Sequence, residues 1–113
     1  DIQTPSAELN AEIEAAAARV NKPLTKARIH SSDVFYHEDN VDGHREFFEK
    51  HGCVCVEMES FALFHNAKIL NKRAACLLTI SDSLVTHAET TAQERQTSFH
   101  DMMLVALETA VAL

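Results

Sequence analysis

Apolar residues recur every three or four positions in the first twenty residues of the chain, a spacing that predicts an amphipathic helix. The apolar stripe comprises Leu9, Ile13, Ala16, Ala17 and Val20. Thr4 is suited to be the N-cap, because Pro5 then occupies the first helical position, where its missing N–H costs nothing. We expect residues 21–23, Asn-Lys-Pro, to end this helix.

Three later segments have the patterns of β-strands. Thr25 to Ser32 alternates between two sets of side chains, which predicts a strand with one face wetter than the other. Cys53 to Val56 is short and apolar, which suits a buried strand. Ala74 to Ile80 is a continuous apolar run, as expected for a strand that is covered on both faces.

Three further helices are predicted between and after these strands. Arg45 to Lys50 predicts a short helix that ends at Gly52, and Met58 to Leu70 predicts a longer one. Thr91 and Glu94 have the spacing of a capping box, so we expect the last helix to begin there and to run towards the C-terminus. Its apolar face is expected to carry Phe99, Met102 or Met103, Ala106 and Ala110.

The predicted element order is α-β-α-β-α-β-α, which favours an α/β layer architecture in one domain over residues 1–113. In open α/β sheets, ligands gather beyond the carboxyl ends of the strands. Acidic or aromatic side chains follow all three predicted strands. The residues that follow the first strand include Asp33, Phe35 and Tyr36. Glu57, Met58 and Glu59 follow the second strand, and Ser81 and Asp82 follow the third.

Composition narrows the functions open to such a fold. The 113 residues include only two glycines, which excludes a P-loop or a GxGxxG turn, because each needs several neighbouring glycines. Ten Lys and Arg residues against seventeen Asp and Glu residues give a formal net charge of −7, which argues against nucleic acid as a partner. No apolar run approaches the ~20 residues of a membrane span, so we expect neither a membrane partner nor a signal peptide.

The cysteines and the first residue of the chain carry two further expectations. The chain has three cysteines, Cys53, Cys55 and Cys76. Because this number is odd, we expect buried, reduced thiols in a cytoplasmic protein rather than a disulfide framework. The chain begins at Asp1 without an initiator methionine, so we expect a fragment or a cleaved product.

Two carboxylates, Glu57 and Glu59, lie two residues apart at a predicted strand-to-helix junction. A carboxylate can accept hydrogen bonds from two adjacent hydroxyls, so this pair is a candidate binder of a diol such as ribose. The alternative is structural, because the helix dipole favours acidic residues in a first helical turn.

A second group of candidates surrounds the third predicted strand. Asp82 follows that strand, where partial desolvation would favour its protonated form and suit it to general-acid catalysis. Arg95, thirteen residues later, is a candidate to orient Asp82 or to stabilise charge. The structural alternatives are that Asp82 caps a turn with Ser81 and that Arg95 is a solvated first-turn residue.

Aromatic and histidine residues complete the candidates. Phe35 and Tyr36 either offer a stacking face to a flat heterocycle or belong to the core. Four histidines are spaced by seven, but the segment that holds them crosses a predicted strand, a turn and a short helix, so they do not share a face. We therefore expect no metal site. These histidines are His30, His37, His44 and His51.

Three stretches taken together resemble the bacterial, hexameric type of purine nucleoside phosphorylase. They are residues 31–36 (SSDVFY), residues 56–60 (VEMES) and residues 79–97 (TISDSLVTHAETTAQERQT). The VEME motif alone is shared by the wider superfamily of nucleoside phosphorylases and nucleosidases. The SD pair followed by the THAETTAQERQT segment is much more specific to this type.

The resemblance implies the reversible phosphorolysis of purine ribonucleosides to free base and ribose 1-phosphate, without a cofactor and with inorganic phosphate as co-substrate. Asp82 matches the general acid that protonates the purine at N7, and Arg95 matches the arginine that assists this proton transfer. Glu59 matches the carboxylate that binds the ribose hydroxyls. The remaining matches are Met58 beside the sugar, Glu57 nearby, Phe35 on the base and Ser81 beside the acid.

The resemblance also implies a fold and partners. The chain matches only the C-terminal part of a three-layer phosphorylase/hydrolase-like α/β fold, in which helices and strands alternate around a mixed sheet. The phosphate site is then expected in an N-terminal half, which either precedes Asp1 or accompanies this chain as a second polypeptide, and the fragment alone is expected to be inactive. The implied assembly is a homo-oligomer, a hexamer arranged as a trimer of dimers. The alternatives are a nucleosidase of the same superfamily, which would use water in place of phosphate, and a catalytically incomplete fragment.

Overall fold

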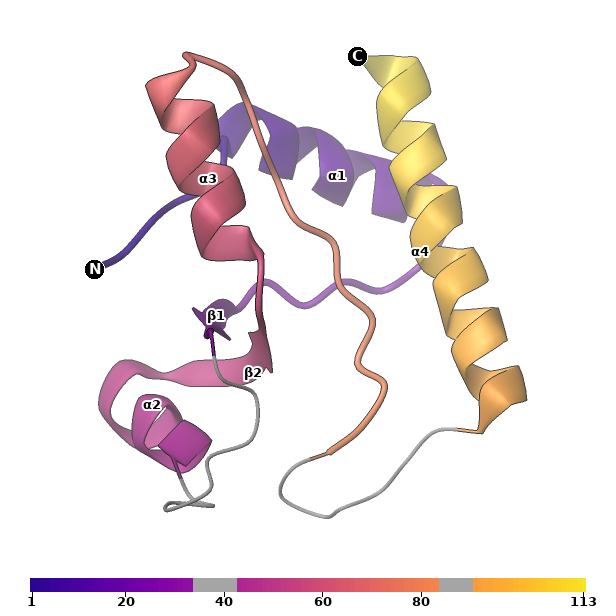
Figure 1. The fold of residues 1–113 in the computed structure, drawn as a ribbon. Coiled ribbons are helices and arrows are strands. Elements are labelled where there is room, and N and C mark those ends of the chain that lie inside the picture. The colour runs from indigo at the N-terminus through magenta and orange to yellow at the C-terminus, as the bar shows by residue number, and fades with distance from the viewer. Residues whose placement is uncertain (34–42, 84–90) are drawn as a thin grey trace. The chain divides into compact units, whose positions relative to one another are not determined.

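The computed structural model describes residues 1–33, 43–83 and 91–113 (Figure 1). The described residues include helices and a small parallel sheet, which confirms the α/β class. In chain order the elements are α1 (Ala7–Arg19), β1 (Arg28–Ser31), α2 (Gly43–His51), β2 (Cys53–Glu57), α3 (Ser60–Ile69) and α4 (Ala92–Ala112). They belong to two compact units: a sheet unit of residues 1–4 and 25–74, and a helical unit of residues 5–24 and 75–113.

The sheet unit is organised around one parallel strand pair. β1 and β2 lie side by side, with Ile29 opposite Cys55 and Ser31 opposite Glu57. Parallel strands need a crossover connection, and α2 lies in the segment that joins them and packs against β2 (Figure 1). The expected mixed sheet stays a prediction, because the described strands form only this parallel pair.

Contacts at the middle and at the C-terminal end of α2 fix its position in the sheet unit. Phe47 stacks on the His30 ring of β1, with centroids 3.6 Å apart and planes 11° from parallel. Gly52 has a φ of +69°, a left-handed conformation that suits glycine, and its N–H donates to the Phe48 carbonyl at 3.0 Å. The helix therefore ends at the glycine, as the sequence predicts, and the chain turns directly into β2.

The helical unit is held by the packing of α1 against α4; in Figure 1 the C-terminal end of α1 meets α4. The buried residues of this unit are Ala16 and Ala17 on α1 and Val105 and Thr109 on α4. The small alanine side chains allow the two helices to approach closely. An ion pair joins Arg19 Nε to a carboxylate oxygen of Glu108 at 2.8 Å, and a second joins Lys22 Nζ to Asp101 at 3.2 Å.

The start of α1 differs from the prediction. Ser6, and not Thr4, is the N-cap, and its Oγ accepts a hydrogen bond from the Leu9 N–H at 3.2 Å. Pro5 consequently lies before the helix instead of inside its first turn. The reason is that the first free amides of the helix are within reach of the Ser6 hydroxyl, and serine is at least as good an N-cap as threonine.

The prediction of a doubly covered strand at Ala74 to Ile80 is wrong, because this segment is described without regular strand structure. A strand exists only if a neighbouring backbone edge accepts its hydrogen bonds. The described elements of its own unit are the helices α1 and α4, which offer no such edge. Leu78 and Ile80 are exposed, so the run is not covered on both faces.

Two further elements depart from the sequence pattern in detail. The capping box of α4 is confirmed, with Thr91 and Glu94 bonded reciprocally. However, the buried positions of this helix are Val105 and Thr109, while the predicted positions Phe99, Ala106 and Ala110 are exposed. The helical period was right, but the identity of the buried face depends on where α1 packs. Similarly, the Cys53–Glu57 strand is only partly buried, because Cys53 is buried but the Val54 side chain, on the opposite face, is exposed.

Candidate functional site

The carboxyl end of β2 holds three of the predicted site residues together. Glu57 is the last residue of the strand, Met58 and Glu59 follow it, and α3 begins at Ser60. The end of β1 lies beside them, since Ser31 is paired with Glu57 and the Ser32 N–H donates to the Glu57 carbonyl at 2.9 Å. This is the strand-to-helix junction that the sequence predicts, although α3 begins two residues later than expected.

The late start of α3 follows from the hydrogen bonds of the Glu57 side chain. One of its carboxylate oxygens, Oε2, accepts from the backbone N–H groups of Glu59 and Ser60, each at 2.7 Å. The other, Oε1, accepts from the Ser60 hydroxyl. These bonds satisfy amides at the beginning of the helix that would otherwise have no partner. Met58 is thereby left outside the helix, in the connection between strand and helix.

The electrostatics of Glu57 agree with this geometry. Partial burial raises the pKa of the Glu57 carboxyl, but its hydrogen bonds have the larger combined effect and lower this pKa below its ordinary value. The donors are the Ser60 hydroxyl, the Glu59 and Ser60 amides and the Ser31 side chain. Glu57 is consequently ionised at neutral pH. By contrast, burial raises the pKa of the neighbouring Cys55 thiol, and the negative charge of Glu57 raises this pKa further. Cys55 is therefore a half-buried, protonated thiol.

Sequence reasoning assigned no role to two serines of this junction. Ser31, at the end of β1, accepts a hydrogen bond from the Phe61 N–H at 3.2 Å and so ties the first strand to the start of α3. Ser60 is buried and hydrogen-bonded to Glu57. A serine directly after a strand-end acidic motif is the only sequence signal that could have indicated this arrangement.

Glu59 and Met58 present their side chains differently from Glu57. Glu59 is the N-cap of α3, yet its side chain makes no capping hydrogen bond and is exposed. Met58 is exposed as well, with 42% of its surface accessible. An exposed carboxylate beside an exposed thioether offers both an acceptor for two hydroxyls and an apolar contact for the carbon frame that bears them.

The second group of predicted residues belongs to the helical unit. The Ser81 hydroxyl donates to a carboxylate oxygen of Asp82 at 3.1 Å. Asp82 is exposed, so the expectation that a buried strand desolvates it is wrong, because residues 74–80 form no strand in the described chain. Arg95 is half-buried in the first turn of α4, where its N–H donates to the Thr91 carbonyl at 3.0 Å.

The remaining predicted residue and the link between Asp82 and Arg95 fall outside the described residues. Phe35 lies in residues 34–42, and residues 84–90 separate Asp82 from the start of α4. Within the described parts, the structure brings together Glu57, Met58 and Glu59 in the sheet unit. It also brings Ser81 against Asp82 in the helical unit.

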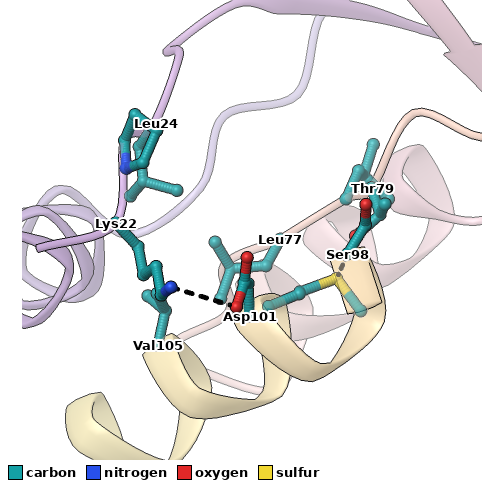
Figure 2. A pocket seen from close by; sticks show the side chains of 10 residues that line it. Lys22, Leu24, Leu77, Thr79, Ser98, Asp101 and Val105 are labelled. Carbon is teal, nitrogen blue, oxygen red and sulfur yellow. Dashed lines mark hydrogen bonds and ion pairs between the residues drawn. The ribbon is translucent and has the colours of Figure 1, made fainter. Parts of the chain in front are cut away.

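A shallow hollow of about 230 Å³ lies within the helical unit, between the segment that follows α1, the apolar run at residues 77–79 and α4. Figure 2 shows Lys22 reaching towards Asp101 on one side of it. The Thr79 hydroxyl donates to the Met102 sulfur at 3.4 Å. None of the predicted site residues that the structure describes lines it. The lining residues are Lys22, Pro23, Leu24, Leu77, Leu78, Thr79, Ser98, Asp101, Met102 and Val105.

Other features bear on the sequence expectations. In the described ranges, none of the three cysteines forms a disulfide, as predicted, but only Cys53 is buried, and Cys55 and Cys76 are half-buried. Those ranges contain no group of three or more His, Cys, Asp or Glu side chains that could hold a metal ion. No described helix combines the length and the apolar character that crossing a membrane requires.

Comparisons with known proteins place this chain in a family. The model of the phosphorylase superfamily matches residues 2–113. The chain is 42% identical over 93 residues to a DeoD-type purine nucleoside phosphorylase of Bacillus velezensis, which covers 82% of this chain and 39% of that protein. It is 44% identical over 92 residues to the DeoD-type enzyme of Bacillus subtilis, covering 81% and 38% respectively. With the DeoD-type enzyme of Shewanella baltica the identity is 40% over 105 residues, covering 93% and 43%. The chain thus spans about two-fifths of the length of these curated relatives.

Proposed function

The chain belongs to the phosphorylase superfamily, and from that premise we propose that it carries the base- and ribose-binding part of a purine nucleoside phosphorylase. The proposed reaction is the reversible conversion of a purine ribonucleoside and phosphate into free base and ribose 1-phosphate. The relatives that are about 42% identical are purine nucleoside phosphorylases by name, which supports this assignment.

One observation of the structure carries the proposal: two carboxylates of the same motif have different surroundings. Glu57 is bonded to the protein at the start of α3, whereas Glu59 is exposed and makes no capping bond. We propose that Glu59 accepts hydrogen bonds from the ribose 2′- and 3′-hydroxyls. Met58 then contacts the sugar. A carboxylate has lone pairs enough to accept from both hydroxyls of a diol.

The proposed chemistry at the base rests on Asp82. A purine is a poor leaving group until a ring nitrogen takes a proton, so a positioned acid at N7 lowers the barrier to breaking the glycosidic bond. In this proposal Asp82 donates the proton, Ser81 holds its carboxylate by the observed hydrogen bond, and Arg95 assists the transfer. Phe35, outside the described residues, is proposed to pack on the base.

The remaining requirements of the reaction are proposals about the whole protein. Phosphate is proposed to be a co-substrate, without a further cofactor, and to bind residues in the part of the relatives that this chain does not match. We propose a cytoplasmic homo-oligomer, a hexamer arranged as a trimer of dimers, that acts in purine salvage. The cysteines, which form no disulfide in the described ranges, fit a reducing compartment, and exposed apolar side chains such as Met103 and Leu107 on α4 fit an assembly.

The proposal is tested by following the cleavage of inosine by the whole protein at increasing phosphate concentration. We expect the rate to rise from near zero and to saturate with phosphate. Equal rates with and without phosphate would contradict the proposal and would identify a nucleosidase, which uses water.

A further inference from the structure

We propose that Glu57 is a positioning residue for Glu59: its carboxylate caps α3 from the end of β2 and so leaves the carboxylate at the N-cap position available to a ribose diol. This inference rests on the function proposed above and assigns the two acids of the motif to different tasks. Glu57 is then not itself a ligand of the nucleoside.

The first support is that the protein itself uses the acceptor capacity of Glu57. An ionised carboxylate has about four lone-pair sites. In this structure they face the Glu59 N–H, the Ser60 N–H and the Ser60 hydroxyl, and the Ser31 hydroxyl is a further donor. Three observed hydrogen bonds therefore direct the Glu57 carboxylate towards the protein, whereas none of the hydrogen bonds of the described residues engages the Glu59 carboxylate.

The second support is an exchange of roles at the start of α3. A residue at an N-cap position normally caps the helix with its own side-chain oxygen. Glu59 occupies this position but makes no such bond, and the first amides are satisfied by Glu57 and Ser31 instead. Because capping is supplied from the strand ends, the Glu59 side chain is released to the solvent.

The third support is that Glu57 is itself fixed. Its backbone is paired with Ser31 of β1, and its carbonyl accepts from the Ser32 N–H. The segment formed by Met58 and Glu59 is therefore held from both sides, by the sheet before it and by the bonded amides after it. A carboxylate on such a short, anchored connection is pre-organised for its ligand.

The experiment has two parts, of which the first does not depend on catalysis. Amide hydrogen exchange is measured in the wild-type protein and in Glu57→Ala, Glu57→Gln and Glu46→Ala. The last is a matched control, because it removes a carboxylate of the same unit that bonds only Lys50 on the surface of α2. We expect Glu57→Ala to accelerate exchange of the Glu59 and Ser60 amides by about tenfold, since a charged acceptor is lost.

Glu57→Gln should have an intermediate effect, because its amide keeps one oxygen acceptor. The Leu70 amide, bonded to the Asn66 carbonyl at the far end of α3, should be unchanged in all variants. Unchanged exchange of the Glu59 and Ser60 amides in Glu57→Ala would overturn the proposal. So would a uniform acceleration along α3, because it would show general destabilisation of the helix.

The second part is a double-mutant cycle on kcat/KM for inosine in the whole protein. We expect Glu59→Ala to reduce kcat/KM by about 10- to 100-fold, as expected for lost hydrogen bonds to a charged acceptor. Glu57→Ala alone should reduce it by about tenfold, mainly through a higher KM, and by less than about twofold in the Glu59→Ala background. The smaller second effect is expected because Glu57 acts through Glu59. Glu46→Ala should have no effect.

The outcomes separate the alternatives. A Glu57→Ala loss that persists unchanged in the Glu59→Ala background would overturn the positioning role, because a direct substrate contact or a general loss of folding gives that result. If the wild-type protein cleaves no nucleoside, the proposed function fails by itself. The exchange measurement then decides whether Glu57 holds the Glu59 segment.

Discussion

Replacement of Val105 by alanine tests the packing that holds α1 against α4. Val105 is 2% exposed and lies on the buried face of α4, with Thr109 one turn later donating its hydroxyl to the Val105 carbonyl at 2.7 Å. Val111, on the same helix, is 78% exposed. The same substitution at residue 111 is therefore a matched control that changes the chemistry equally but removes little buried surface.

The magnitude follows from the two carbon atoms that Val105→Ala removes. At about 0.8 kcal/mol for each buried methylene, the lost transfer free energy is roughly 1.6 kcal/mol. The cavity adds about 24 cal/mol per Å³ that does not collapse. Alanine has a higher helix propensity than valine, which offsets the loss of stability by up to about 0.7 kcal/mol. The free energy of unfolding should thus fall by roughly 1–3 kcal/mol for Val105→Ala. For Val111→Ala, which loses little buried surface and gains the same helix propensity, it should not fall by more than about 0.5 kcal/mol.

The assay is urea denaturation of the purified protein followed by far-ultraviolet circular dichroism, with the slopes of the transitions compared between variants. Equal slopes with a lower midpoint for Val105→Ala alone would agree with the described packing. If the two variants differed by less than about 0.5 kcal/mol, Val105 would not be a core residue and the pairing of α1 with α4 would be refuted.

Two further predictions concern the candidate site. Asp82→Asn should lower the rate of inosine cleavage by more than about tenfold, since positioned acids contribute ~10²–10⁴, and a near-wild-type rate would remove Asp82 from the mechanism. The second prediction concerns the dependence of stability on pH. Hydrogen bonds lower the pKa of Glu57 below its ordinary value of 4.5, so the ionised carboxylate stabilises the folded state above that pH. This contribution is lost as the pH falls through the folded-state pKa. Urea denaturation should therefore show a wild-type advantage over Glu57→Gln that is constant near neutrality and shrinks below pH 4.5, and an advantage that grows on acidification would contradict the sign.

The sequence predicts elements well where the signal is local. The capping box at Thr91 and the stop at Gly52 are set by residues within a few positions of each other, and both are confirmed. The strand predicted at Ala74 to Ile80 is absent because a strand needs a neighbouring strand edge to pair with. The pattern of one segment does not show whether such an edge is present. The prediction of the buried face of α4 was wrong for the same reason, because the position of α1 determines that Val105 is buried.

The candidate site shows a similar division. The position of Glu57 and Glu59 at a strand-to-helix junction could be predicted, because acidic residues between a β-branched run and a helical stripe mark such a junction. Their separate surroundings could not be predicted. Which of the two caps α3 depends on the register that places Ser31 beside Glu57, and that register is a property of the strand pairing.

The most direct test of the central proposal is the identity of the sugar product. The whole protein is incubated with inosine and inorganic phosphate, and the products are followed by phosphorus-31 NMR and by chromatography of the base. We predict ribose 1-phosphate and hypoxanthine in equal amounts, with a matching loss of inorganic phosphate. Release of hypoxanthine with free ribose, and with the phosphate signal unchanged, would contradict the assignment as a phosphorylase.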